Sequence, residues 1–79
     1  MTNQENRPVK ATFQSPGSHA EYQAYWNGKT YQNGNQYITV RAGSGKEMKV
    51  VVNGGVCTEY HMSYGRELAE AAAKSVGLL

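Results

Sequence analysis

Apolar and polar residues alternate along most of the first sixty positions, with the two-residue period of a strand that buries one face. The alternation runs through five segments separated by turn-forming residues: 9–13, 21–26, 37–41, 47–52 and 56–62. The third of these segments, YITVR, is rich in β-branched and aromatic residues, which favour strands. The pattern therefore predicts several short strands that follow one another along the chain.

The residues between these segments are typical of tight turns. Asn-Gly pairs occur at positions 27–28, 33–34 and 53–54, and the stretch AGSG occupies positions 42–45. Asn-Gly suits two-residue hairpin turns because both central residues take positive φ. We therefore expect residues 30–32 to begin a return strand after the first Asn-Gly pair, and the strands to form an antiparallel meander.

The pattern changes after Ser63, where strong helix formers replace the alternating segments. Ser63 is a favourable N-cap, and Gly77 stands where a glycine commonly follows a helix. Together these signals predict a helix from about Tyr64 to Val76. Its expected inner stripe recurs every four residues and consists of Tyr64, Leu68, Ala72 and Val76.

These elements predict an α+β domain, namely a four- to five-stranded antiparallel β-meander with one C-terminal α-helix packed on one face. Residues 1–8 are polar and lack periodicity, so we interpret them as a flexible N-terminal tail that ends at Pro8. Residues 9–79 then form a single small α+β domain, as the length of 79 residues indicates.

One helix covers only one face of such a sheet, so the alternation assigns each strand residue to a core face or to an open face. The predicted core comprises Val9, Ala11, Phe13, Tyr22, Ala24, Trp26, Ile38, Val40, Met48, Val50 and Val52, with Leu68, Ala72 and Val76 from the helix. The predicted open face comprises Lys10, Thr12, Gln23, Tyr25, Tyr37, Thr39, Arg41, Lys49, Val51, Cys57, Glu59 and His61.

The open face combines aromatic rings, cations and hydroxyl groups, and its candidate binding residues are Tyr25, Tyr37, Arg41, Lys49 and His61. Three interpretations compete. Rings on a sheet can stack on bases while Arg and Lys contact phosphates. Tyrosines can equally anchor a protein partner or a second copy of the chain. An ordinary solvated sheet is the third interpretation, because Tyr and Thr are good strand formers.

Charge and cysteine usage narrow the class of protein. The chain carries 8 Lys and Arg against 6 Glu, and these charges are scattered along the chain with a net charge of +2, so nucleic-acid binding is permitted without being favoured.

Cys57 is the one cysteine, which rules out an internal disulfide and favours a reducing compartment. With two histidines it does not complete a zinc site, so we expect no metal and no cofactor. No apolar leader or membrane-spanning run occurs, which predicts a cytoplasmic protein without membrane contact.

The stretch AGSGKE over residues 42–47 has only part of a phosphate-binding P-loop. The position of the first required glycine holds Val40, and Glu47 follows Lys46 where Ser or Thr is needed. We therefore interpret the stretch as a hairpin turn.

Other combinations of reactive residues are equally unpromising for catalysis. Cys57 and His61 are four residues apart, which on a strand places them on the same face but about 13 Å from each other. Glu67 and Glu70 lie on the predicted helix beside Arg66 and Lys74, as on a solvated face. We therefore expect a protein that is not an enzyme.

In its order of elements, the chain resembles small sheet-plus-helix DNA-binding modules such as the plant AP2 type and integrase arm-binding domains. The resemblance spans residues 20–77 and rests on the strand and helix signals alone. A short chain with an open aromatic face and no catalytic set is also similar in type to accessory proteins of phages and mobile elements, of which anti-CRISPR-like inhibitors are an example.

We therefore expect a non-catalytic binding or regulatory module that acts on a protein partner through the aromatic and basic open face. An inhibitor of a host nucleic-acid-processing complex is the narrower form of this expectation. The alternative is a nucleic-acid-binding sheet-plus-helix module. Because one sheet face lacks a covering layer, self-association into a homodimer, sheet to sheet or edge to edge, is also expected.

Overall fold

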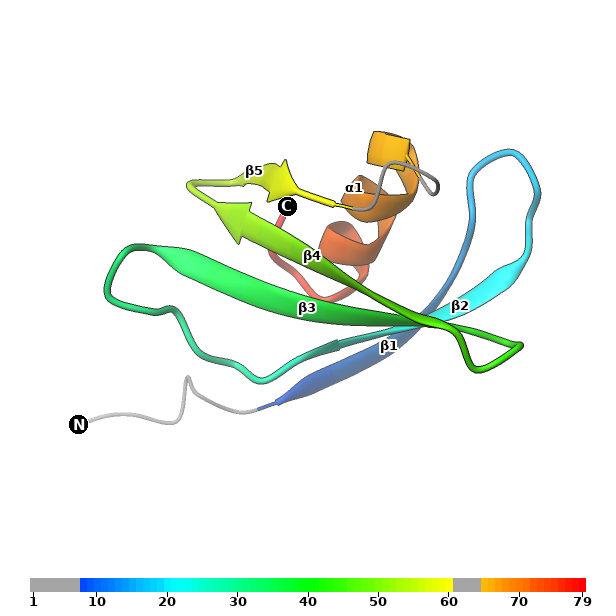
Figure 1. Cartoon of the computed structure of the whole chain (residues 1–79), viewed down its shortest axis with the longest axis horizontal. Coiled ribbons are helices and arrows are strands. Elements are labelled where there is room, and N and C mark those ends of the chain that lie inside the picture. The colour runs from blue at the N-terminus through cyan, green and yellow to red at the C-terminus, as the bar shows by residue number, and fades with distance from the viewer. Residues whose placement is uncertain (1–7, 61–64) are drawn as a thin grey trace.

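A five-stranded antiparallel sheet with one helix on one face makes up the fold (Figure 1). The computed structural model describes residues 8–60 and 65–79. The strands neighbour one another in chain order, so the predicted α+β meander is confirmed. The elements are β1 (Val9–Gln14), β2 (Glu21–Trp26), β3 (Asn35–Ala42), β4 (Glu47–Asn53), β5 (Val56–Glu59) and α1 (Gly65–Ser75).

The β4–β5 turn forms as its sequence predicts. Asn53 pairs with Val56, which leaves Gly54 and Gly55 as the two central residues, with φ of 63° and 81°. Positive φ at both positions is the requirement of the tight hairpin turn that suits the twist of the flanking strands.

The β2–β3 connection differs from expectation, because residues 27–34 form a loop and 30–32 are not a strand. Local hydrogen bonds pair backbone N–H groups of this loop without a partner strand. The backbone N–H of Lys29 donates to Asn27 Oδ1 over 3.0 Å, and that of Gly34 donates to the Tyr31 carbonyl over 2.8 Å. The side chain of Trp26 also contacts the loop, since its ring N–H donates to the Lys29 carbonyl over 3.0 Å.

The last strand also differs, both in length and in the face it presents. β5 ends at Glu59 rather than continuing to Met62, which lies outside the described residues. The β4–β5 register shifts between Val51 and Val52, so that Val51 pairs with Glu59 while Val52 pairs with Cys57. One extra residue in a strand reverses the faces of the residues beyond it. Cys57 is therefore in the core, and its assignment to the open face is wrong.

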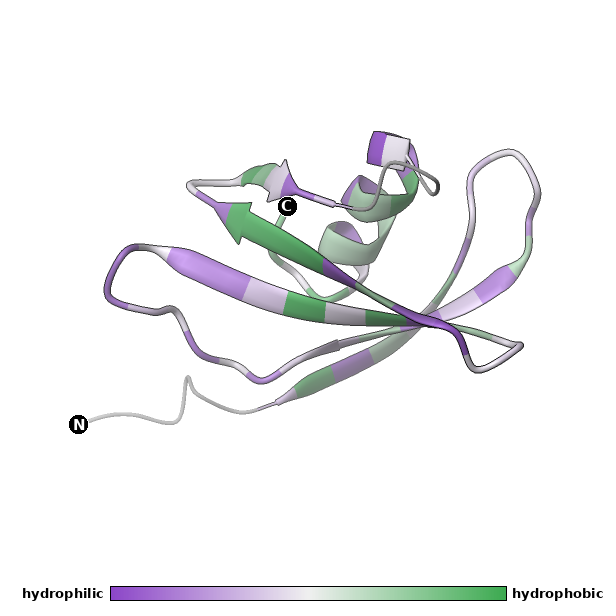
Figure 2. Cartoon of the chain, in the orientation of Figure 1, coloured by the Kyte–Doolittle hydropathy of each residue, from purple (hydrophilic) through white to green (hydrophobic). Residues whose placement is uncertain are grey.

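Residues on the predicted core face pack together under the helix, where apolar strand positions gather (Figure 2). The fully buried strand side chains are aliphatic, and the β1 and β2 side chains near the sheet edge are half-buried against them. The buried set is Ala24, Ile38, Val40, Met48, Val50, Val52, Leu68, Ala72 and Val76, and the half-buried set is Val9, Ala11, Phe13, Tyr22 and Trp26.

Helix α1 contacts every strand and buries a wider stripe than the one predicted. Ala69 and Ala73 are also buried, and their small side chains let the helix lie close to the sheet. The helix ends at Ser75, one residue before the predicted Val76, and Gly77 follows it with a φ of 86°, as a glycine after a helix commonly does. The N–H of Leu78 donates to the Ala73 carbonyl over 2.9 Å, which satisfies a carbonyl of the last turn. The predicted start, at Ser63 and Tyr64, lies outside the described residues. Within the described chain, no helix has the length and apolarity needed to cross a membrane.

Leu68 is the largest buried helix side chain, at 3% exposure, so it anchors the helix to the sheet. We predict that Leu68→Ala lowers the free energy of unfolding by about 2–4 kcal/mol, from lost apolar contact and the cavity left behind. Urea unfolding followed by tryptophan fluorescence measures the change. The matched control, Glu67→Gln, alters the neighbouring exposed position in the first helical turn and should change stability by about 1 kcal/mol or less, which is the usual contribution of a carboxylate near a helix N-terminus. Equal effects of the two substitutions would contradict helix docking through Leu68.

Candidate functional site

The face of the sheet opposite the helix presents the polar and aromatic strand residues to solvent. Strand register arranges most of them in two rows that cross four strands. The first row is Lys10, Tyr25, Thr39 and Lys49, and the second is Thr12, Gln23, Arg41 and Glu47. We call these two rows, with Tyr37 in the adjoining position of β3, the open face.

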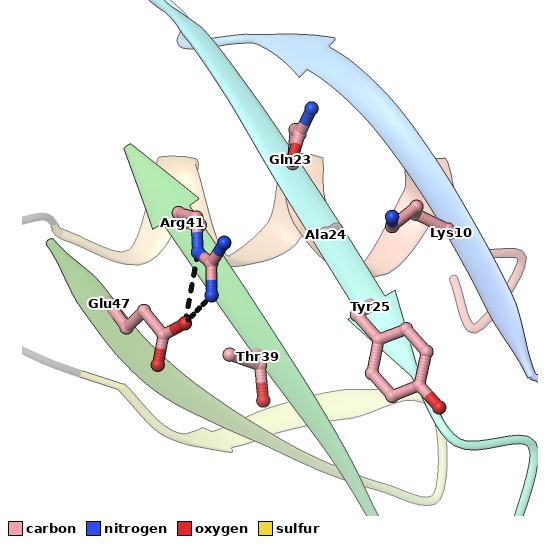
Figure 3. A pocket seen from close by; sticks show the side chains of 7 residues that line it. All are labelled: Lys10, Gln23, Ala24, Tyr25, Thr39, Arg41 and Glu47. Atoms are coloured by element: carbon pink, nitrogen blue, oxygen red, sulfur yellow. Dashed lines mark hydrogen bonds and ion pairs between the residues drawn. The ribbon is translucent and has the colours of Figure 1, made fainter. Parts of the chain in front are cut away.

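A shallow hollow of about 450 Å³ lies on the open face over β1 to β4 (Figure 3). The ring of Tyr25 stands at one side of it and is 42% exposed. Arg41 and Glu47 lie at the other side, and Thr39 and Gln23 lie between. The hollow is open and is lined by side chains from four different strands.

Arg41 is held by Glu47 across the β3–β4 hairpin. Both Nε and Nη2 of Arg41 donate to Glu47 Oε2, and the Nε contact measures 3.0 Å. Both side chains remain about half exposed. The pair fixes the guanidinium in place and offsets its charge, so Arg41 is a poorer phosphate ligand than a free arginine. Glu47 was not among the predicted site residues, although its position directly after the 42–46 turn that Arg41 precedes was a usable signal.

The described strands carry equal numbers of positive and negative side chains on the helix-free side. The cations are Lys10, Arg41 and Lys49, and the carboxylates are Glu21, Glu47 and Glu59. Surfaces that bind nucleic acid concentrate cations, because phosphate neutralisation supplies most of their affinity. The helix-free side of the described strands therefore lacks the excess of cations that is typical of such surfaces.

The β2–β3 loop adds a third tyrosine beside the open face. The ring of Tyr31 meets that of Tyr37 edge to face, with centroids 5.2 Å apart. Each hydroxyl accepts a hydrogen bond from an asparagine, Tyr37 from Asn35 Nδ2 over 3.0 Å and Tyr31 from Asn27 Nδ2 over 3.2 Å. The two rings are therefore oriented before any partner arrives. Tyr31 was missed because residues 30–32 were interpreted as a strand, and its contact with Tyr37 depends on the loop conformation.

Asn53 ties the same loop to the sheet. Its Nδ2 donates to the Asn33 carbonyl over 3.0 Å and to Asn35 Oδ1 over 2.8 Å. Gly34 has φ of 89°, and a Cβ there would lie 3.2 Å from Asn53 Nδ2. The loop is thus fixed by polar contacts to β4, which helps to hold Tyr31 against Tyr37.

Four of the five predicted site residues share the open face. Tyr25 and Arg41 line the hollow, Lys49 ends the row that contains Tyr25, and Tyr37 is 37% exposed in the adjoining position. His61 lies outside the described residues. Val51, also predicted on this face, is only 8% exposed and sits in register between Tyr37 and Glu59.

The other sequence features that could indicate ligand or metal binding do not form a site among the described residues. The 42–46 stretch is the β3–β4 turn, in which the Ala42 N–H donates to the Lys46 carbonyl and the Gly45 N–H to the Ala42 carbonyl. Its predicted assignment as a hairpin turn is confirmed. Among the described residues, no three His, Cys, Asp or Glu side chains are grouped so as to hold a metal ion.

Comparison with known proteins adds no family assignment. No family model matches the chain, and no curated protein or solved structure matches it either. The site must therefore be interpreted from its own geometry.

Cys57 is buried beneath the helix, and burial raises the pKa of its thiol, with the Glu70 carboxylate adding to the rise and Arg66 opposing it. We predict that the native thiol reacts slowly with a disulfide reagent at pH 8 and rapidly in urea, because the thiolate is the nucleophile. A fast native reaction would contradict the enclosed site.

The raised pKa of Cys57 makes the free energy of unfolding depend on pH in the alkaline range. An unfolded thiol loses its proton near the ordinary pKa of 9.0, whereas the folded thiol keeps it to higher pH. The folded state then binds more protons, so the free energy of unfolding falls as pH rises above about 9. Urea unfolding from pH 7 to 11 should show a steeper fall for the wild type than for Cys57→Ala. Parallel curves would contradict the raised pKa.

Proposed function

We propose that this protein is a non-catalytic binding module that binds a protein partner through its open face. The observation that carries the proposal is the combination of exposed, oriented tyrosines with balanced charge on one side of a five-stranded sheet. Tyrosine and arginine are enriched where proteins recognise proteins, because a ring buries a large area while its hydroxyl still bonds to water or partner.

Preorganisation supports this role. Tyr37 and Tyr31 are fixed by ring contact and asparagine hydrogen bonds, and Arg41 is fixed by Glu47. Side chains that are already ordered lose less conformational entropy on binding. The open face therefore offers anchors whose ordering cost has largely been met during folding.

The narrower form of the proposal is an inhibitor that blocks a host nucleic-acid-processing complex by surface contact, as small accessory proteins of phages and mobile elements do. Its support is the type of chain: 79 residues, a single small domain, and an exposed binding face. Contact without chemistry is enough for such a role, and a rigid sheet supplies it.

One feature of the open face favours the second candidate, binding of single-stranded nucleic acid. In the first row, Lys10 on β1 and Lys49 on β4 lie on either side of Tyr25. Three interstrand spacings, about 14 Å, separate the two lysine positions. A base stacked on Tyr25 would bring its neighbouring phosphates toward these two lysines. The carboxylates on the same side weigh against this candidate.

Removing the anchors should abolish capture of the partner. We predict that Tyr25→Ala/Tyr37→Ala loses a protein that tagged wild type retains from nuclease-treated host lysate, because both rings are exposed on the open face. The matched control, Lys74→Ala/Leu79→Ala, removes a cation and an exposed apolar side chain near the C-terminus and should retain the partner. Circular dichroism checks that both variants fold. A partner retained by the tyrosine variant would place the site elsewhere.

Direct measurement separates the two candidates. Fluorescence anisotropy with labelled mixed-sequence 20-nucleotide DNA and RNA should show no saturable binding at about 10 µM protein in 0.15 M salt, since the charges on the open side balance. Tight binding that falls steeply between 0.05 and 0.2 M salt, on the order of a hundredfold or more, would establish the nucleic-acid candidate instead.

A further inference from the structure

The two edge strands of the sheet differ in length and regularity. β5 has four residues, and its pairing with β4 is interrupted by a register shift. β1 has six residues and pairs with β2 without interruption from Val9 to Gln14. In the part of the chain that the structure describes, no strand pairs with the outer side of β1. A regular, unpaired edge without proline is a template for another strand.

The side chains of β1 that face the helix are incompletely covered. Val9, Ala11 and Phe13 pack against the core but remain half-buried at the edge of the sheet. A further strand beside β1 would cover them and continue the core layer outward.

We propose that the occupant is β1 of a second copy of this chain, paired antiparallel with Thr12 on the two-fold axis. Thr12 then lies opposite Thr12 of the second copy, Ala11 opposite Phe13, and Lys10 opposite Gln14. The proposal concerns the edge of the sheet and does not rest on the function proposed for the open face.

The register follows from parity and charge. A two-fold axis through a residue keeps helix-facing side chains of the two copies on the same side, whereas an axis between residues would mix the faces. An axis through Lys10 places the two Lys10 ammonium groups directly opposite each other. An axis through Ala11 places the two Lys10 Cα atoms about 8 Å apart. An axis through Phe13 pairs only three residues of each strand. With Thr12 on the axis, the two Lys10 Cα atoms are about 14 Å apart and five residues pair.

Size and charge are complementary in this register. Phe13, whose ring stacks on Tyr22 with centroids 5.9 Å apart, meets the small Ala11 of the second copy, and the reverse contact repeats across the axis. On the other side, Gln14 pairs with Glu21 within each chain. Lys10 of the second copy therefore lies two strand spacings, about 10 Å between Cα atoms, from a carboxylate of opposite charge.

The resulting assembly is a continuous ten-stranded sheet with both helices on one side and both open faces on the other. Two copies of a binding surface held side by side favour a partner that is itself repeated or symmetric, because the second contact becomes intramolecular.

Cysteine cross-linking tests the register. Directly opposite Cα atoms lie about 4.5–5.5 Å apart, within the range of a disulfide. Thr12→Cys should form a covalent dimer of twice the 8.7 kDa chain mass under mild oxidation. Lys10→Cys and Gln14→Cys should each stay uncrosslinked alone and cross-link when mixed. The wild type is the control, because its Cys57 is buried. Cross-linking of Lys10→Cys alone, or none for Thr12→Cys, would overturn the proposal.

Light scattering across a concentration series tests the assembly itself. Wild type should pass from monomer to dimer by about 100 µM, and Thr12→Lys, which sets two cations opposite each other, should weaken dimerisation at least about tenfold. Thr39→Lys makes the same change on central strand β3 and should leave dimerisation unchanged. A wild type that stays monomeric, or equal weakening by both substitutions, would overturn the proposal.

Discussion

Docking of one short helix against one face of a five-stranded sheet determines the rest of this structure. The helix of eleven residues is about 16 Å long, and five strands span about 19 Å between the outermost strands, so a single helix suffices for one face only. Apolar burial is therefore concentrated on the helix side, although Val51 is also buried on the opposite side. The alanines of the helix and the aliphatic residues of β3 and β4 form the core, and the charged strand residues are directed to the other side.

A face left without a cover is held in place by the pairing of its strands and by a few side-chain contacts. The ion pair of Arg41 with Glu47 and the ring contact of Tyr37 with Tyr31 fix side chains that would otherwise move freely. The Asn53 hydrogen bonds extend this order to the β2–β3 loop. Such an arrangement suits recognition by contact, since the anchors are ordered and the charges balance.

Much of the fold and most of the candidate site follow from a period of two. The alternation is strict from Tyr37 to Arg41 in β3 and from Glu47 to Val50 in β4, so the core positions there and the places of Tyr37, Arg41 and Lys49 could be assigned from the sequence. The structural features that could not be predicted depend on contacts and register shifts that the alternation of apolar and polar residues does not encode. A one-residue shift in register between β4 and β5 moved Cys57 into the core. The 27–34 loop closes through side-chain hydrogen bonds, which Asn-Gly pairs alone do not reveal.

The central claim is that the face opposite the helix touches the protein partner. A photo-reactive benzoylphenylalanine in place of Tyr25, irradiated in living cells that produce the protein, tests it most directly. The account predicts a discrete adduct that survives nuclease and is digested by protease, and no such adduct when the same residue replaces Lys74 on the helix. Adducts formed only from position 74, or an adduct from position 25 that nuclease removes, would contradict it.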